Sequence, residues 1–448
     1  MAGAERSVAK RVCIVGAGPS GLTAVKTLRQ AGLEASCFEM SPVVGGHWVI
    51  DNPNGRAAAY RSLRTNTTKP MSRFSDFEMP AEWPAYPSHE QVRAWLESYV
   101  DAFGFRDAIH TQTTVTRAAP RAGGGWEVSL TTADGQTRTE AFDALVAASG
   151  SYWDARIPKW DGAFDGAVLH AQDYRDPTTP FDARGKHVVV VGIGNTGCEL
   201  ACELAAGGAA SVHISARGGT WILPKTVNGA PASDAAPMTH PADPVIRRFN
   251  LLPTWARQAA FQQIAKRRIQ AMFGARMARL QALGMPAPPE HPLSKRPTTS
   301  DEIVGALESG AVKARPGIER LDGGEVVFSD GSRQAADLVL CATGYRLTYP
   351  YFDPGVVDTR GEDLSLFMGV VAPEREDIFF VGVSRPTGAF WPIAEVQAQF
   401  VAKMLTGAYR PPSRKARVRR ARPILGRNAW NPALYGLELR EELRRGRR

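Results

Sequence analysis

The chain has 448 residues, of which 44% are hydrophobic and 22% charged, which excludes a disordered polyelectrolyte, a collagen-like fibre and a disulfide-stapled mini-protein. No apolar run reaches the roughly 18 residues that span a bilayer, and the five cysteines lack C-x-x-C spacing, so we expect a cytoplasmic protein of two or three domains. The net charge of +9 is concentrated in residues 409–448, where 13 Lys and Arg stand against 3 Asp and Glu. This distribution predicts a basic C-terminal tail and no nucleic-acid partner.

The first predicted unit is a strand, a glycine-rich turn, a helix and a second strand. Residues 10–15 (KRVCIV) are an apolar run that ends in the turn 16–21 (GAGPSG), residues 22–31 are apolar at helical spacing, and 33–39 (LEASCFE) are typical of a strand. In this G-x-G-x-x-G pattern the glycines allow a tight turn, close approach of a pyrophosphate and close helix packing. Glu39 stands near the position of a carboxylate that accepts hydrogen bonds from a ribose. The unit therefore predicts a dinucleotide site.

A second unit of the same kind begins at residues 187–191 (HVVVV), which are followed by the turn 192–197 (GIGNTG), a helix over 198–206 and a strand over 211–215. Here Arg217, not an acidic residue, follows the second strand. A guanidinium suits the additional 2′-phosphate of NADP, where a carboxylate would repel it. Arg217 alone would be an ordinary surface arginine, but its place after a second nucleotide motif favours the functional interpretation. We therefore expect FAD in the first site and NADPH in the second.

Two nucleotide sites in one chain suggest a flavoprotein that takes hydride from NADPH. Disulfide reductases share this plan but need a redox-active cysteine pair beside the flavin. Cys198 and Cys202 are four residues apart on one predicted helix, a separation that makes a disulfide awkward, so we exclude this class. The sequence also has no His, Cys, Asp and Glu cluster with metal-ligand spacing and no G-x-S-x-G elbow.

Residues 245–285 contain eight Arg and Lys, no acid, and apolar residues at helical spacing. This pattern predicts a basic amphipathic helical insertion. We favour a solvated helix packed on the NADP domain over peripheral contact with an anionic membrane or a lid over the substrate entrance. Elsewhere, alternating residues predict paired strands at 125–132, 137–148, 326–328 and 337–341.

A further stretch, 164–174 (FDGAVLHAQDY), carries a family resemblance. Phe164, Gly166, His170 and Tyr174 fit the F-x-G-x-x-x-H-x-x-x-(Y/F) pattern of the flavin-containing monooxygenases. The related Baeyer–Villiger monooxygenases have Trp at the last fixed place. Tyr174, followed here by Arg175, favours the enzymes that oxygenate heteroatoms over those that oxygenate ketones.

Four other segments resemble the same family in the same order over roughly residues 10–405: 45–48 (GGHW), 60–66 (YRSLRTN), 74–77 (FSDF) and 341–345 (CATGY). The resemblance implies a cycle in which NADPH reduces FAD, oxygen forms a flavin C4a-hydroperoxide, and an amine nitrogen or a sulfide sulfur takes the distal oxygen. The protein must keep that adduct dry. Asn66 matches the family's catalytic position at the flavin edge, whereas His170, with no carboxylate partner in view, is expected to be structural.

The fold implied is α/β, with two Rossmann-like dinucleotide-binding domains, the NADP domain being inserted into the FAD domain. We expect the FAD domain at 1–160 and 325–410, the NADP domain at 161–324 and the basic tail at 411–448. The residues expected to bind the cofactors are Gly16, Gly18, Pro19, Ser20, Gly21, Glu39, Gly46, His47, Trp48, Thr65, Asn66, Thr67, Val115, Gly192, Gly194, Asn195, Thr196, Gly197, Arg217, Thr343 and Gly344.

Two alternatives stay open. The same scaffold could perform Baeyer–Villiger oxidation of a ketone or N-hydroxylation of a primary amine. A flavoprotein that only senses NADPH, or binds a partner, would share both nucleotide motifs without turnover. The partners expected are a small nucleophilic substrate and O2, and the sequence leaves the oligomeric state undetermined.

Overall fold

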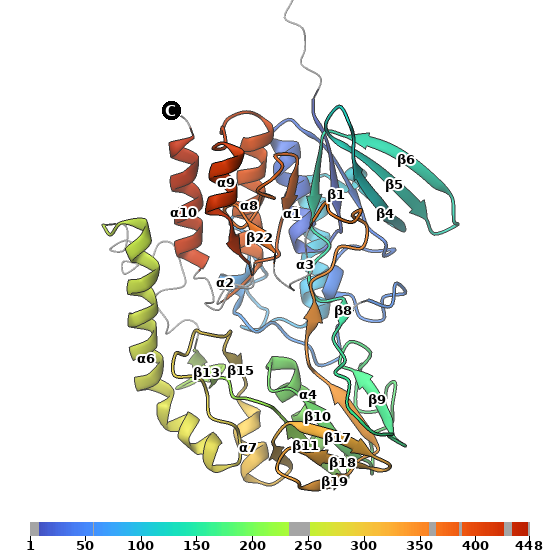
Figure 1. Cartoon of the computed structure of the whole chain (residues 1–448), viewed down its shortest axis with the longest axis vertical. Helices are drawn as coiled ribbons and strands as arrows, with labels where there is room; N and C mark the ends of the chain where they lie inside the picture. The colour runs from blue at the N-terminus through green and yellow to red at the C-terminus, as the bar shows by residue number, and fades with distance from the viewer. Residues whose placement is uncertain are drawn as a thin grey trace, which may run out of the picture.

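A computed structural model describes residues 9–56, 58–232, 251–357, 364–384, 388–424 and 432–446. Two units, each built around a parallel sheet, lie one above the other along the long axis of the molecule (Figure 1). The sheet of the first unit has the order β23 (Ile378–Phe380), β7 (Ala144–Ala147), β1 (Arg11–Val15), β2 (Glu34–Phe38) and β3 (Ile109–His110). Its central strands are buried on both faces, as expected for parallel strands covered by helices.

Helices α1 (Pro19–Gln30), α3 (His89–Phe103) and α8 (Trp391–Leu405) supply most of the helical surface that packs on this first sheet. Ser88 caps α3 by accepting from Gln91 N, while the Gln91 side chain accepts from Ser88 N. This reciprocal capping box fixes where α3 begins. The three-stranded antiparallel sheet of β4 (Thr113–Pro120), β5 (Trp126–Thr132) and β6 (Thr137–Phe142) flanks the unit.

The sheet of the second unit has the order β16 (Val312–Arg315), β11 (Ser211–Ser215), β10 (His187–Val191), β20 (Leu338–Cys341) and β9 (Ala167–His170), and all of its pairings are parallel. Helices α4 (Asn195–Ala206) and α7 (Glu302–Glu308) pack on it. The two nucleotide motifs therefore stand in two separate sheets, which confirms the predicted α/β class with two Rossmann-like units.

The pairing of strands places the chain's return to the first domain later than expected. The expected return to the first domain at residue 325 falls inside an antiparallel sheet of β17 (Ile318–Asp322), β18 (Glu325–Phe328) and β19 (Arg333–Ala335). The chain then continues into β20, which pairs with β10 of the second unit. These hydrogen bonds place the return after Cys341. Likewise, the expected strand 137–148 is two strands, β6 and β7, in different sheets.

The chain crosses between the units twice, and the two crossings pair with each other. β8 (Asp154–Ala155) runs antiparallel to β21 (Tyr345–Arg346). An ion pair of 2.8 Å between Asp154 and the Arg346 guanidinium supports this ribbon, and Thr348 donates to the same carboxylate at 3.0 Å. The second unit is thus inserted into the first through two adjacent segments.

The predicted helical insertion is present as α6 (Thr254–Ala282), and residues 245–250 lie outside the described part. Its C-terminal half packs on the second unit through Met277 and Leu280. Its N-terminal half instead contacts α10 (Pro432–Arg445) through Phe261, which shares a small core with Leu434. Met272, expected on the apolar face, is 53% exposed. The helix therefore bridges two parts of the molecule, as its long course in Figure 1 shows.

In the described part of residues 411–448, the expected basic tail is folded against the first unit, whereas residues 425–431 and 447–448 lie outside the described residues. Helix α10 packs on α8 (Figure 1), and Tyr435, Leu439 and Leu443 belong to the core of the first unit. Helix α9 (Arg414–Arg420) is joined to the same unit through Arg417, which donates to the Pro373 carbonyl at 3.2 Å. The charges are satisfied locally, because Glu442 is buried and accepts from Arg420 and from the Tyr409 hydroxyl. Apolar residues spaced by one helical turn outweigh the positive charge that surrounds them.

The remaining short elements lie in the connections: η1 (Gly46–Trp48), α2 (Lys69–Ser72), η2 (Arg106–Ala108), β12 (Ile222–Leu223), β13 (Thr226–Val227), β14 (Ala230–Pro231), β15 (Thr298–Thr299), β22 (Ser365–Leu366) and β24 (Arg422–Pro423). Among the described helices, none is long and apolar enough to cross a membrane.

Candidate functional site

The two glycine motifs stand at the carboxyl ends of β1 and β10, where ligands bind in parallel α/β sheets. Gly18 is the N-cap of α1 and Gly194 is the N-cap of α4, and neither helix start is capped by a side chain. The first-turn N–H groups and the positive end of each helix dipole therefore face outward from the sheet. Such an end binds a phosphate.

The glycines of the first motif are required for different reasons. A methyl group at Gly16 would lie 2.9 Å from the Ala148 carbonyl oxygen, and one at Gly21 would overlap the Gly16 carbonyl. At Gly18 the nearest atom would be the Cα of Gly46 at 3.7 Å, an ordinary contact. The outer glycines thus allow the protein to pack on itself. The middle glycine keeps a space clear beside the helix start.

The second motif repeats this division. A methyl group at Gly192 would lie 2.5 Å from the Ala342 carbonyl oxygen, and one at Gly197 would overlap the Gly192 carbonyl. No atom of the described residues lies within 4 Å of the corresponding position at Gly194. Both motifs therefore leave an open cradle at the middle glycine, where a side chain would displace a pyrophosphate. The residues present fit a dinucleotide at each position.

Glu39 follows β2 and lies over the first motif. Its carboxylate accepts from Ala17 N at 2.7 Å and Ser41 N at 2.8 Å. Burial raises the pKa of Glu39 above its usual value, and these backbone hydrogen bonds oppose the shift. Each oxygen still has a lone pair for a ribose hydroxyl. Val115, on β4, contributes its side chain to the neighbouring core, which leaves only its main chain for a cofactor.

The 45–48 turn packs directly on the first motif, because Gly45 N donates to Ala17 O and a methyl group at Gly46 would lie 3.0 Å from the Cα of Gly18. Burial lowers the pKa of His47 to about 4, so its ring is neutral at pH 7. The His47 Nδ1 atom is buried without a hydrogen-bond partner among the described residues. Trp48 packs against the cores of both units and meets the edge of Trp391, with ring centroids 5.6 Å apart.

Two consecutive polar side chains also lack partners. Thr65 Oγ1 and Asn66 Oδ1 are buried, and neither forms a hydrogen bond within the part of the chain that the structure describes. Thr67 differs, because its hydroxyl is 2.7 Å from Ser72 Oγ. An unpaired buried polar atom costs about 1–3 kcal/mol. The unpaired atoms of His47, Thr65 and Asn66 therefore mark the place where the polar groups of a bound cofactor fit.

Pro19 and Ser20 form the first turn of α1, and the Ser20 side chain abuts Gly382, so the segment after β23 closes on the first motif.

In the second site, Asn195 and Thr196 begin α4, and Asn195 Oδ1 accepts from Thr299 N at 2.9 Å. Arg217 is exposed just after β11, and no hydrogen bond or ion pair to another described residue holds it. Its guanidinium is therefore available to an anion.

Thr343 and Gly344 support the crossing between the units. The Thr343 hydroxyl donates to the Arg156 carbonyl, and the Gly344 carbonyl accepts from Arg156 N and from His170 Nε2 at 3.1 Å. His170 Nδ1 accepts from Gln172 N, so the buried ring is neutral with both nitrogens engaged, and burial lowers its pKa. These contacts fit the structural role expected for His170.

An aromatic cluster that no sequence motif predicts lies at the junction of the units. Tyr152 lies between His47, Tyr345 and Phe390, with ring centroids 5.6–6.3 Å apart. The Arg296 guanidinium lies 5.0 Å from the centre of the Phe390 ring. These five residues come from five distant segments, and no local pattern connects them.

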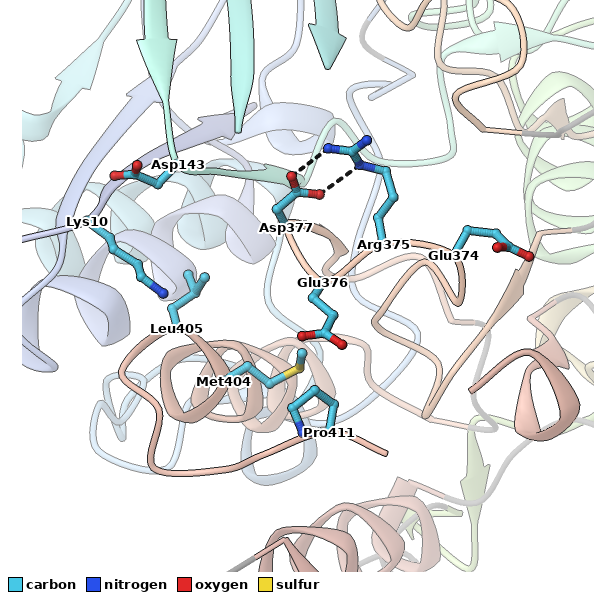
Figure 2. Close-up of a pocket in the computed structure, with 9 residues that line it drawn as sticks. All are labelled: Lys10, Asp143, Glu374, Arg375, Glu376, Asp377, Met404, Leu405 and Pro411. Atoms are coloured by element: carbon cyan, nitrogen blue, oxygen red, sulfur yellow. Dashed lines mark hydrogen bonds and ion pairs between the residues drawn. The ribbon is translucent and has the colours of Figure 1, made fainter. Parts of the chain in front are cut away.

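Figure 2 shows a cavity of about 460 Å³ in the first unit. Lys10, Asp143 and Asp377 line it just before β1, β7 and β23, at the amino ends of the strands and opposite the glycine motif. Asp377 forms an ion pair with Arg375 at 2.6 Å, which Figure 2 shows as dashed lines. This cavity is therefore separate from the nucleotide site.

Comparisons with known proteins agree with this geometry. Residues 9–427 match the family model described as flavin-binding monooxygenase-like. The chain is 31% identical over 419 residues to flavin-containing monooxygenase 5 of Cavia porcellus, an alignment that covers 90% of this chain and 75% of the relative. Similar solved structures are S-allyl-L-cysteine S-oxygenase from Allium sativum (22% identity, TM-score 0.65, 91% and 80% of the two chains) and ε-caprolactone-bound cyclohexanone monooxygenase (18%, TM-score 0.70, 98% and 99%).

Proposed function

The chain belongs to the flavin-binding monooxygenase-like family, and from this premise we propose that it oxygenates a soft nucleophile, the nitrogen of an amine or the sulfur of a sulfide, in a small molecule. As a flavin monooxygenase it is an oxidoreductase that depends on FAD and NADPH. When bound, FAD would supply the hydride acceptor for NADPH and the means of activating O2, in a reaction that delivers one oxygen atom to the substrate and the other to water.

In the first site, the start of α1 binds the FAD pyrophosphate at the space that Gly18 keeps clear, and Glu39 accepts from the ribose. In the second, the start of α4 binds the NADPH pyrophosphate beside Gly194. Arg217 pairs with the 2′-phosphate, since no described carboxylate competes for it. These residues would hold FAD in the first unit and NADPH in the second.

Asn66 is the catalytic residue in this proposal. Its unpaired amide oxygen is buried near the junction, in the segment that also carries the unpaired Thr65 hydroxyl. This buried, unpaired amide oxygen is the single observation that carries the proposal. An amide shielded from water can bind the reacting edge of the flavin and the nicotinamide, whereas in an exposed site water would take its hydrogen bonds. Trp48 packs against the cores of both units and meets Trp391 edge to face, and these rings exclude water where the two cores meet.

Tyr174 and Arg175 favour heteroatom oxygenation over ketone oxygenation. In the structure, Arg175 forms an ion pair with Asp51 at 2.9 Å and donates to the Gln172 carbonyl at 2.7 Å, so its guanidinium is already engaged within the protein. The solved relatives named above include an S-oxygenase and a ketone oxygenase, and at these identities they support the fold alone. Baeyer–Villiger oxidation is therefore the competing outcome of the test.

The test is product analysis with an aryl alkyl sulfide, a tertiary amine and a cyclic ketone, each with NADPH and O2. We expect S-oxide or N-oxide in proportion to NADPH consumed, and Asn66→Ala to divert NADPH oxidation into hydrogen peroxide while leaving anaerobic flavin reduction intact. Lactone as the main product would overturn the proposal, and so would full product yield from Asn66→Ala.

A further inference from the structure

The first residues of the segment 60–66, which carries Asn66, are anchored to the second unit, although the segment precedes that unit by more than a hundred residues in the chain. Tyr60 and Leu63 belong to the core formed around β10 and β11. Arg61 N donates to the Arg175 carbonyl at 2.8 Å, and the Arg61 guanidinium pairs with Asp176 at 2.8 Å. The end nearer Asn66 is also tied to the first unit, because Leu63 O accepts from His89 N at 3.0 Å and Thr65 N donates to Pro87 O at 2.9 Å. Residues 60–66 therefore connect the second unit to the start of α3.

Two carboxylates on α4 hold this segment. Glu199 accepts from the Tyr60 hydroxyl, and Glu203 accepts from the Ser62 hydroxyl at 2.7 Å. Residues four apart lie on one face of a helix, so both acids face residues 60–62. Lys225 completes the contact by donating to the other Glu199 oxygen at 2.8 Å, and both side chains of this pair are 15% exposed.

The Tyr60–Glu199 hydrogen bond is charge-assisted and largely shielded from solvent. Burial, and then the neighbouring Glu199 carboxylate, raise the pKa of Tyr60 well above its usual value. The hydroxyl consequently remains a donor throughout the working range of pH. Hydrogen bonds to a charged group contribute more than neutral ones.

The same helix forms the nucleotide site at its other end. Gly194 caps α4, and Glu199 lies little more than one turn further along. We propose that Glu199 is a positioning residue that transmits NADP occupancy at the start of α4 to Asn66, through the Tyr60 hydroxyl. The nicotinamide nucleotide and the catalytic amide are then set by one rigid element. This inference rests on the proposed function, and it names how that site senses its nucleotide.

Amide hydrogen exchange of the FAD-loaded protein, with and without NADP⁺, tests the coupling directly. The reporters are the N–H groups of Arg61, Leu63 and Thr65, all hydrogen-bonded within or around the segment. We expect NADP⁺ to slow their exchange by about tenfold in the wild type, the effect of one charge-assisted hydrogen bond. Tyr60→Phe and Glu199→Gln should abolish most of this difference.

Tyr409→Phe is the matched control, because it removes another buried tyrosine hydroxyl from a glutamate, Glu442 at 2.8 Å, far along the chain. It should lose stability as Tyr60→Phe does and keep the NADP⁺ effect. The inference is overturned if the wild type shows no NADP⁺ effect, if Tyr60→Phe and Glu199→Gln retain it, or if Tyr409→Phe loses it equally.

Peroxide yield provides the second readout. Tyr60→Phe should raise hydrogen peroxide per NADPH several-fold while anaerobic flavin reduction by NADPH stays within about twofold of wild type, a split that general destabilisation would not produce. Equal peroxide from Tyr409→Phe would contradict the positioning role. If the wild type shows the exchange effect but oxygenates none of the three test substrates, the proposed function fails while the coupling stands.

Discussion

At the scale of single residues, the middle glycine of each motif serves a ligand and the outer glycines serve the protein. Gly194→Ala adds a methyl group where no protein atom lies within 4 Å. We therefore expect unchanged thermal stability and a KM for NADPH raised by roughly tenfold, about 1.4 kcal/mol. Gly197→Ala should instead lower the free energy of unfolding by about 1–3 kcal/mol, because its methyl group overlaps the Gly192 carbonyl. Thermal melts with steady-state kinetics separate the two, and equal destabilisation would contradict the assignment.

Arg217 is the residue on which discrimination between nucleotides should depend. Arg217→Gln removes the guanidinium expected at the 2′-phosphate, and we expect KM for NADPH to rise by about tenfold or more, with KM for NADH little changed. Arg279→Gln, which removes an exposed cation paired with Glu308 in the same unit, is the control. A parallel rise for both nucleotides would show that Arg217 only supports the fold.

His213 predicts a pH dependence of stability. Burial, and then the nearby Arg315 guanidinium, lower the pKa of His213 to about 4. The unfolded chain binds this proton more readily, so the contribution to the free energy of unfolding is complete above pH 6.5. It falls toward pH 4 by up to about 1.4 kcal/mol per pH unit. His213→Gln should reduce the change in the urea-unfolding midpoint between pH 7 and pH 5. If the midpoint of the variant changes with pH as much as that of the wild type, the prediction is refuted.

Some residues of the site could be predicted from a local sequence motif and others could not. Motifs predicted Gly18, Gly194 and Asn66, because each stands in a short run with fixed spacing. Glu199 and Tyr152 were not singled out, since their partners come from distant segments that only the folded chain brings together. Long-range contacts of this kind produce no fixed spacing of residues along the sequence.

At the scale of elements, the C-terminal helices show that a strongly basic segment can still contribute buried side chains to a core. Leu439→Ala removes a fully buried side chain from α10 and should cost about 2–5 kcal/mol. Arg444→Ala, on the same helix, should change stability by no more than about 0.5 kcal/mol. Urea unfolding with FAD bound measures both, and a solvated tail would leave both variants unchanged.

The apolar spacing in α10 indicates a packed helix, but the high positive charge of the segment favours a tail. Tyr435, Leu439 and Leu443 recur every four residues, the spacing of one helix face, yet the surrounding arginines favoured a tail. For α6 the spacing correctly predicted a helix. It did not reveal that Phe261 packs on Leu434, because an amphipathic pattern identifies a buried face without identifying its partner.

At the scale of the whole molecule, α6 connects the C-terminal helices to the second unit. Phe261→Ala should weaken the contact with Leu434, and Leu280→Ala should weaken only the packing of α6 on the second unit. We expect each to cost about 2–5 kcal/mol. Hydrogen exchange in residues 434–443 should accelerate in Phe261→Ala and not in Leu280→Ala. Equal acceleration would show that the two ends of α6 are not separate contacts.

The inserted arrangement of the units could be predicted from the order of the two motifs, but the residue at which the chain returns could not. Strands β18 to β20 alternate and turn like any antiparallel connection, and only their pairing with one another and with β10 assigns them to the second unit. Pairing partners are a property of the assembled sheet.

Because β8 and β21 are hydrogen-bonded neighbours, the entering and leaving strands share a single line. Figure 1 places this line on the side of the molecule opposite α6 and α10. A rotation of the inserted half about the line would displace α6 most, and it is there that Phe261 and Leu434 join the two halves a second time. The contact between α6 and α10 therefore restrains the motion that the paired strands alone would allow.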